Sequence, residues 1–180
     1  MNGRPPHAVE QKVHDIRRAF GPVIGARLRS YSTAEILHDD GTWGAWPDLP
    51  VRLEWDSGHL VALAWSKFDD LQILAAASAS WAAFDDPWVA TDSAAPLTVS
   101  GTTARWVADA SIAVRQVVGA SLLSVALGRG EMSVAGHDIE IWTRVLLETE
   151  AGWLEIFNAL DENGFAHYRE RPPGDLVPCI

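Results

Sequence analysis

The chain has 180 residues, of which 48% are hydrophobic and 21% are charged, and this balance excludes an intrinsically disordered protein. Its formal net charge of −10 argues against nucleic acid or an anionic membrane as the main partner, because both would repel the protein. A basic protein remains a permitted partner.

Cysteine usage and the N-terminal sequence indicate the compartment. The one cysteine, Cys179, has no second thiol with which to form an intramolecular disulfide, which favours a reducing environment. The N-terminal residues MNGRPPHAVEQ contain no apolar run of the kind found in signal peptides. The weakly polar run from Leu71 to Phe84 is too short to cross a bilayer. We therefore expect a cytoplasmic protein.

The first half of the chain predicts one helix followed by strands. Val9, Val13, Ile16 and Phe20 recur at helical spacing, and Gly21-Pro22 ends this pattern. Apolar and polar residues then alternate as they do in half-buried strands. The predicted strands are Val23–Tyr31, Val51–Trp55, His59–Trp65 and Leu71–Ala75, with turns at Asp56–Gly58 and Lys67–Asp70 and a loop at His38–Pro50.

The second half has a less regular pattern. Ala76–Thr103 is compatible with either helix or strand, and Ala104–Val118 is predicted to be a helix from its place in the chain. The remaining predictions are a glycine-containing insert at Leu127–Gly136, a long strand at Ile139–Thr149, a turn at Asp161–Gly164, a strand at Phe165–Tyr168 and a proline-rich tail at Arg169–Ile180.

The strongest feature of the sequence is an internal repeat. A shift of 94 residues superposes VRLEWDSGHLVA, which starts at Val51, on VLLETEAGWLEI, which starts at Val145, with no gap. The same shift superposes Val23 on Val117 and Gly25 on Gly119. Ten identities in two blocks share this offset: Val23, Gly25, Ala26, Leu28, Ser30, Val51, Leu53, Glu54, Gly58 and Leu60 with Val117, Gly119, Ala120, Leu122, Ser124, Val145, Leu147, Glu148, Gly152 and Leu154.

The repeat predicts an α+β, strand-dominated fold made of two tandem pseudo-symmetric repeats. Each repeat would contain a short helix and about four mainly antiparallel strands. Half of a 180-residue chain is small for independent stability, so we expect a single domain. The expected bounds are about 8–75 for repeat 1, 76–101 for the connector, about 102–168 for repeat 2 and 169–180 for the tail.

Catalytic and metal-binding signatures are missing from the sequence. It contains no G-x-S-x-G, no G-x-G-x-x-G, no phosphate loop and no H-E-x-x-H, so we expect no cofactor, no metal and no intrinsic catalysis. The adjacent acids Asp39-Asp40, Asp69-Asp70 and Asp85-Asp86 are typical of solvated turns. Glu54 and Glu148 are the acidic pair that the repeat relates; they could meet across a twofold axis or bind arginines such as Arg52 and Arg144.

One stretch resembles a known group of proteins. The run LEIFNALDENG at Leu154–Gly164, together with Gly119-Ala-Ser-Leu and Leu147-Glu-Thr-Glu-Ala-Gly-Trp, is similar to small bacterial proteins of the toxin-immunity type. The resemblance covers about a third of the chain. It implies a protein that neutralises a cognate toxin by binding it, and it carries over no functional residue.

The predicted partner-binding residues lie in the two loops that the repeat does not match. Tryptophan is enriched at interaction surfaces, although loop tryptophans can also cover the edge of a core. Acidic neighbours would attract a basic partner such as a nucleic-acid-degrading toxin. Two other functions stay open: a small-ligand-binding protein or hydrolase with a site between the repeats, and a structural homo-oligomer. The candidate binding residues are Asp39, Asp40, Trp43, Trp46, Asp48, Asp85, Asp86 and Trp88.

Overall fold

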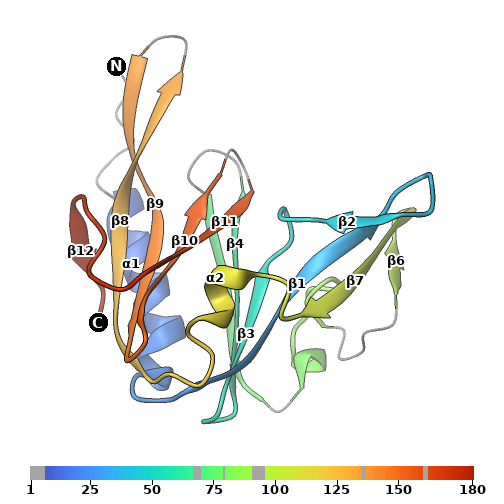
Figure 1. The fold of residues 1–180 in the computed structure, drawn as a ribbon, viewed down its shortest axis with the longest axis horizontal. Helices are drawn as coiled ribbons and strands as arrows, with labels where there is room; N and C mark the ends of the chain where they lie inside the picture. The colour runs from blue at the N-terminus through green and yellow to red at the C-terminus, as the bar shows by residue number, and fades with distance from the viewer. Residues whose placement is uncertain (1–6, 67–69, 79, 91–95, 135–136, 160–161) are drawn as a thin grey trace.

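The computed structural model contains two antiparallel sheets and one long helix (Figure 1). It describes residues 7–66, 70–78, 80–90, 96–134, 137–159 and 162–180. The fold is α+β and strand-dominated, as the sequence predicts. The helical elements are α1 (His7–Phe20), η1 (Gly21–Val23), η2 (Trp81–Ala83) and α2 (Ile112–Arg115).

The first sheet has seven strands, hydrogen-bonded in the order β5-β4-β3-β1-β7-β6, with β2 also pairing with β1. β1 is longer than β3, so β2 pairs with the end of β1 that β3 leaves unpaired. The strands are β1 (Leu28–Leu37), β2 (Trp43–Ala45), β3 (Val51–Trp55), β4 (His59–Ser66), β5 (Asp70–Ala77), β6 (Leu97–Val99) and β7 (Thr102–Ala108).

The second sheet has five strands in the order β11-β10-β9-β8-β12. In Figure 1 the β8–β9 hairpin extends past the rest of the molecule, and β12 lies beside β8. β12 pairs antiparallel with β8 in this sheet, and β7 pairs antiparallel with β1 in the first sheet. The strands are β8 (Leu122–Val134), β9 (His137–Thr149), β10 (Gly152–Asn158), β11 (Asn163–Tyr168) and β12 (Leu176–Pro178).

The core lies between the inner faces of the two sheets and α1. Side chains alternate between the faces of a strand, so Leu53 on β3 and Leu147 on β9 point inward while their neighbours point outward. The apolar stripe of α1 adds Ile16 and Phe20, both fully buried. The outer face of the first sheet carries a second apolar cluster, formed by Leu60, Ala62, Trp81, Phe84 and Val89.

The two sheets join where residues 25–28 meet residues 119–122. The Gly25 N–H donates to the Leu122 carbonyl at 2.8 Å, and the Gly119 N–H donates to the Leu28 carbonyl at 2.7 Å. Gly25 and Gly119 are 94 positions apart, as are Leu28 and Leu122, so the two hydrogen bonds are reciprocal. Both glycines have a positive φ, which a residue with a side chain adopts only with strain. Arg27 and Ser121, also 94 positions apart, form an antiparallel bridge between them.

Some strand pairings also recur 94 residues later in the chain. Ser30 of β1 pairs with Glu54 of β3, and Ser124 of β8 pairs with Glu148 of β9. The β1–β3 pairing has an irregularity between Leu28 and Ser30, and the β8–β9 pairing has one between Leu122 and Ser124. In the hairpins that follow, the strand pairing differs by one residue. Val51 pairs with Leu63, whereas Val145 pairs with Ile156 and not with Phe157, the residue 94 positions after Leu63.

Four sequence predictions are corrected by the structure. The helix predicted over Ala104–Val118 is wrong, since β7 occupies its start and only Ile112–Arg115 is helical. The predicted insert at Leu127–Gly136 continues as β8 to Val134. The predicted tail contains β12, and Cys179 after it is buried. The loop at His38–Pro50 contains the short strand β2. β7 and β12 pair with strands far away in the chain, which local sequence does not reveal. β2 and the end of β8 instead pair with the neighbouring strand of a hairpin.

Other predictions are confirmed. The helix from His7 to Phe20 and the strands at Val51–Trp55, His59–Trp65 and Ile139–Thr149 are present. Residues 67–69 of the turn predicted at Lys67–Asp70 lie outside the described part of the chain. The same is true of residue 161 in the turn predicted at Asp161–Gly164. Among the described residues, no helix combines the length and the apolar character needed to cross a membrane.

Candidate functional site

The structure brings Trp46 and Trp88 together from separate segments. Their rings meet edge to face with centroids 5.3 Å apart and an interplanar angle of 85°. The Trp46 indole N–H donates to the Asp48 carboxylate at 3.1 Å, and the Asp86 carboxylate accepts the backbone N–H of Trp88 at 2.8 Å. Both rings are half-buried, so part of each faces solvent. We call Trp46, Asp48, Asp85, Asp86 and Trp88 the paired-tryptophan surface.

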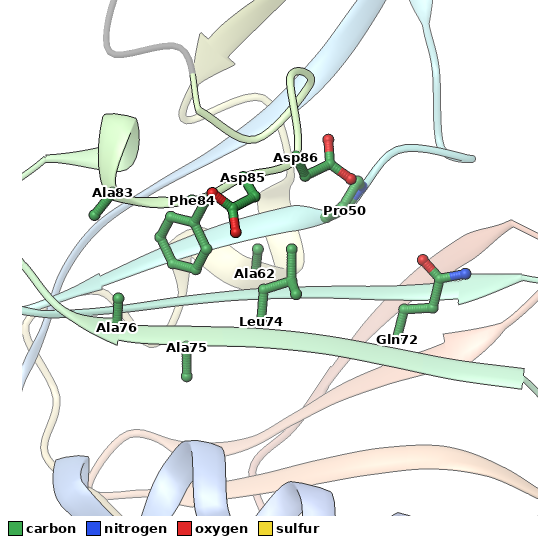
Figure 2. Close-up of a pocket in the computed structure, with 10 residues that line it drawn as sticks. All are labelled: Pro50, Ala62, Gln72, Leu74, Ala75, Ala76, Ala83, Phe84, Asp85 and Asp86. Atoms are coloured by element: carbon green, nitrogen blue, oxygen red, sulfur yellow. The ribbon is translucent and has the colours of Figure 1, made fainter.

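Asp85 and Asp86 also line a pocket on the outer face of the first sheet (Figure 2). The pocket has a volume of about 330 Å³, and its floor is formed by Ala62 and Leu74. Asp86 lies beside Pro50 in this view. The Asp85 side chain is exposed, whereas Asp86 is half-buried because its carboxylate caps the turn at Trp88. The pocket therefore opens next to the paired-tryptophan surface.

Trp43 has a different environment. The Arg105 guanidinium lies over its ring at 4.2 Å from the centroid. The same guanidinium binds Glu35 at 2.6 Å, from the neighbouring position on β1. Trp43 is thus held at the β1–β2 hairpin by a cation from β7, and no described contact links it to Trp46 or Trp88.

Asp39 and Asp40 lie in the turn of the β1–β2 hairpin, at the far end of β1 in Figure 1. Hydrogen bonds from the hydroxyl and the backbone N–H of Thr42 lower the pKa of the Asp40 carboxyl. Both aspartates are exposed and act as turn residues in this conformation. The structure therefore groups five of the eight predicted residues and leaves Asp39, Asp40 and Trp43 apart from them.

A buried arginine lies behind the paired-tryptophan surface. Arg52 is only 4% exposed, and its guanidinium lies 4.1 Å from the centroid of Trp81 and 4.5 Å from that of Trp106. The Trp106 indole N–H donates to the Trp88 carbonyl at 3.0 Å. This stack fixes the segment that carries Trp88 against β3 and β7. The sequence does place Arg52 on the outward side of a short apolar strand. It could not reveal the two tryptophans that contact Arg52, because they lie 29 and 54 residues further along the chain (81 − 52 and 106 − 52).

Glu54 completes this network. Its carboxylate accepts the Ser30 hydroxyl at 2.7 Å and the Trp81 indole N–H at 2.9 Å. Partial burial raises the pKa of Glu54, but the two hydrogen bonds and the positive charge of Arg52 outweigh it and lower the pKa.

Glu54 and Glu148 do not meet. Each points away from the shared core, on the outer face of its own sheet, because each alternates with inward-facing residues of its strand. The hypothesis of a shared carboxylate site on a twofold axis is therefore wrong. Glu148 accepts the Ser124 hydroxyl at 2.5 Å, as Glu54 accepts that of Ser30.

A second pocket lies where the two sheets approach each other. It has a volume of about 280 Å³ and a mostly apolar lining. Trp46 and Leu49 line it from the first half of the chain, and Asn163 and Phe165 line it from the second. The amide of Asn163 is already bonded to Trp65, Leu49 and Leu63, so this pocket offers an occupant mainly apolar contact.

Within the described residues, no three His, Cys, Asp or Glu side chains converge as metal ligands would. Comparison with protein-family models, curated proteins and solved structures finds no match to this chain. Function must therefore be inferred from the geometry of the surfaces described above.

Proposed function

We propose that the protein binds a basic protein partner through the paired-tryptophan surface, and that it acts in the cytoplasm as an immunity protein against a bacterial toxin. The observation that carries this proposal is the contact between Trp46 and Trp88. It unites the two segments in which the two halves of the chain differ, while strands common to both halves support them.

The chemistry of the surface suits a protein partner. Half-buried indole rings give large apolar contact area with little loss of side-chain freedom, which is why tryptophan is enriched among residues that dominate binding energy. Asp48, which accepts the Trp46 indole N–H, and Asp85, which precedes Trp88 by three residues, are both exposed. Together with a net charge of −10, they would accelerate association with a positively charged protein.

Replacing both Trp46 and Trp88 by Ala should weaken binding about 30-fold or more, since each removes a central aromatic anchor. The hydrogen bond from Trp106 to residue 88 uses the backbone carbonyl and survives the change. The measurement is calorimetry with the purified product of the neighbouring reading frame, at low and high salt. Raising the salt should weaken the wild-type complex by slowing association.

Trp43→Ala is the matched control, because Trp43 is a half-buried tryptophan of the same chain segment but is held by Arg105. It should leave the affinity within about threefold, the range expected outside the dominant residues of an interface. Equal losses in the control and in the double variant would contradict the assignment of binding to this surface.

A small-ligand-binding function is the second candidate, favoured by the 280 Å³ pocket between the sheets. Its ligand would be small and apolar, because the lining presents few unsatisfied polar groups. A thermal-shift screen of apolar compounds would support it if a stabilising compound lost its effect in Phe165→Ala. A hit that kept its effect in that variant would bind elsewhere.

We further infer that the two halves are copies of one ancestral unit related by a twofold axis near Arg27 and Ser121. Support comes from the common strand order, the reciprocal hydrogen bonds of Gly25 and Gly119, and the matching pairs Ser30–Glu54 and Ser124–Glu148. On this view β7 corresponds to β12, so repeat 1 extends beyond residue 75. A crystal structure in which residues 23–55 and 117–149 failed to superpose would refute it.

A further inference from the structure

The outer face of the second sheet contains a pocket of about 540 Å³ around Glu148. The Ser124 hydroxyl donates to Oε2 of Glu148, and within the described part of the chain no donor reaches Oε1. Trp153 lies opposite Glu148 on β10, so their Cβ atoms are about 5 Å apart on the same face of the sheet. Both side chains line the pocket and both are half-buried.

The matching position in the first sheet shows what such a carboxylate binds when its surroundings are complete. Oε2 of Glu54 accepts a serine hydroxyl, Oε1 accepts the indole N–H of Trp81, and the Arg52 guanidinium stacks on that indole. This site therefore combines three groups, namely a carboxylate, an aromatic ring and a guanidinium.

The second sheet supplies only two of these groups. Residue 146, which is 94 positions after Arg52, is a fully buried leucine, so β9 provides no cation next to Glu148. The segment that crosses this sheet, residues 169–175, is also shorter than the one that carries Trp81, and it places no indole over the carboxylate. Trp153 supplies an aromatic ring from β10 instead.

We propose that the pocket around Glu148 and Trp153 binds a guanidinium group, either of a small molecule or of an arginine side chain. A guanidinium would donate to Oε1 of Glu148 and stack on Trp153, and this stacking would repeat, with an external group, the contact that Arg52 makes with Trp81. This site lies on the second sheet, so the proposal does not depend on the paired-tryptophan surface of the first.

Two further charged residues line the pocket, Glu170 and Arg171. With Glu148 they give the lining a net side-chain charge of −1 (two carboxylates and one guanidinium), which favours a cation. Arg171 is exposed and lines the same pocket, so we expect its side chain to compete with an external guanidinium for Glu148. Removing it should open the site to an external guanidinium.

The test is a titration of the full chain with methylguanidinium, followed by two-dimensional NMR of the tryptophan indole N–H groups. The Trp153 signal, assigned with Trp153→Phe, should shift with saturation. Glu148→Gln, which keeps the shape and the acceptor for Ser124, should weaken binding about tenfold, because a charge-assisted hydrogen bond is lost. Arg171→Ala should tighten binding about twofold or more.

Three comparisons make the result decisive. Methylurea, which has a similar shape and no charge, should not shift the Trp153 signal. Asp56→Asn, which removes one exposed carboxylate from the β3–β4 turn of the other sheet, should leave methylguanidinium binding unchanged. A blocked Gly-Arg-Gly peptide that binds more tightly than methylguanidinium would identify an arginine side chain as the natural occupant, whereas weaker peptide binding would identify a small molecule. Equal binding to wild type and Glu148→Gln, or equal effects of Glu148→Gln and Asp56→Asn, would overturn the proposal.

Discussion

Replacing Arg144 by Met should lower the free energy of unfolding by roughly 3–5 kcal/mol, the cost of leaving a buried charge without its partner. Arg144 binds Glu155 through two hydrogen bonds, at 2.5 and 3.1 Å, and the two side chains are only 15% and 6% exposed. Methionine preserves the apolar stem but leaves the Glu155 carboxylate in a dry environment. Urea unfolding followed by tryptophan fluorescence measures the loss.

The expected loss of stability comes from the unpaired Glu155 carboxylate rather than from the missing Arg144 side chain alone. The double variant Arg144→Met with Glu155→Gln should therefore be more stable than Arg144→Met, because it removes the buried charge. Arg129→Met is the control on the same strand pair. Its partner Asp175 is 64% exposed, and this exposed pair should contribute under about 1 kcal/mol. Equal losses in Arg144→Met and Arg129→Met would show that burial of the Arg144–Glu155 pair does not determine its contribution.

The sequence predicted those elements whose pattern is determined locally. The helix that ends at Gly21-Pro22 and the strand Val51–Trp55 have strong periodicity, and both are present. β7 was missed because ARWVA satisfies both a strand and a helix pattern, and its pairing with β1, about 70 residues earlier, decides between them. β12 was missed for a similar reason. Its three residues lie among prolines and form a strand only because β8 offers an unpaired edge.

Contacts between distant parts of the chain also limited what the sequence could predict about the candidate site. The sequence identified Trp46 and Trp88 as loop tryptophans, but their contact depends on how the segment after β5 returns across the sheet. It could not reveal that Arg105 holds Trp43, or that Arg52 stacks between two indoles, because both interactions join side chains far apart in the chain. Glu54 and Glu148 were recognised as equivalent, but alternation along their strands places them on separate outer faces.

Asn163 is the clearest case of a residue whose role its local sequence conceals. The run Asp-Glu-Asn-Gly predicts a solvated turn, yet Asn163 begins β11 and is only 5% exposed. Its side-chain oxygen accepts the backbone N–H of Trp65 at 3.0 Å, and its amide nitrogen donates to the Leu49 carbonyl at 2.9 Å. One amide group thereby connects the second sheet to β4 and to the segment before β3.

Asn163→Ala should therefore cost about 3 kcal/mol, because a buried N–H and a buried carbonyl both lose their partner. Hydrogen exchange supplies a specific readout, since the Trp65 amide should exchange faster relative to other amides of β4. Asn163→Asp keeps an acceptor for Trp65 but places a carboxylate oxygen against the Leu49 carbonyl, so it should be no less destabilising at neutral pH than Asn163→Ala. A loss below about 1 kcal/mol in both variants, with unchanged exchange at Trp65, would mean that the hydrogen bonds of Asn163 contribute little to holding the two sheets together.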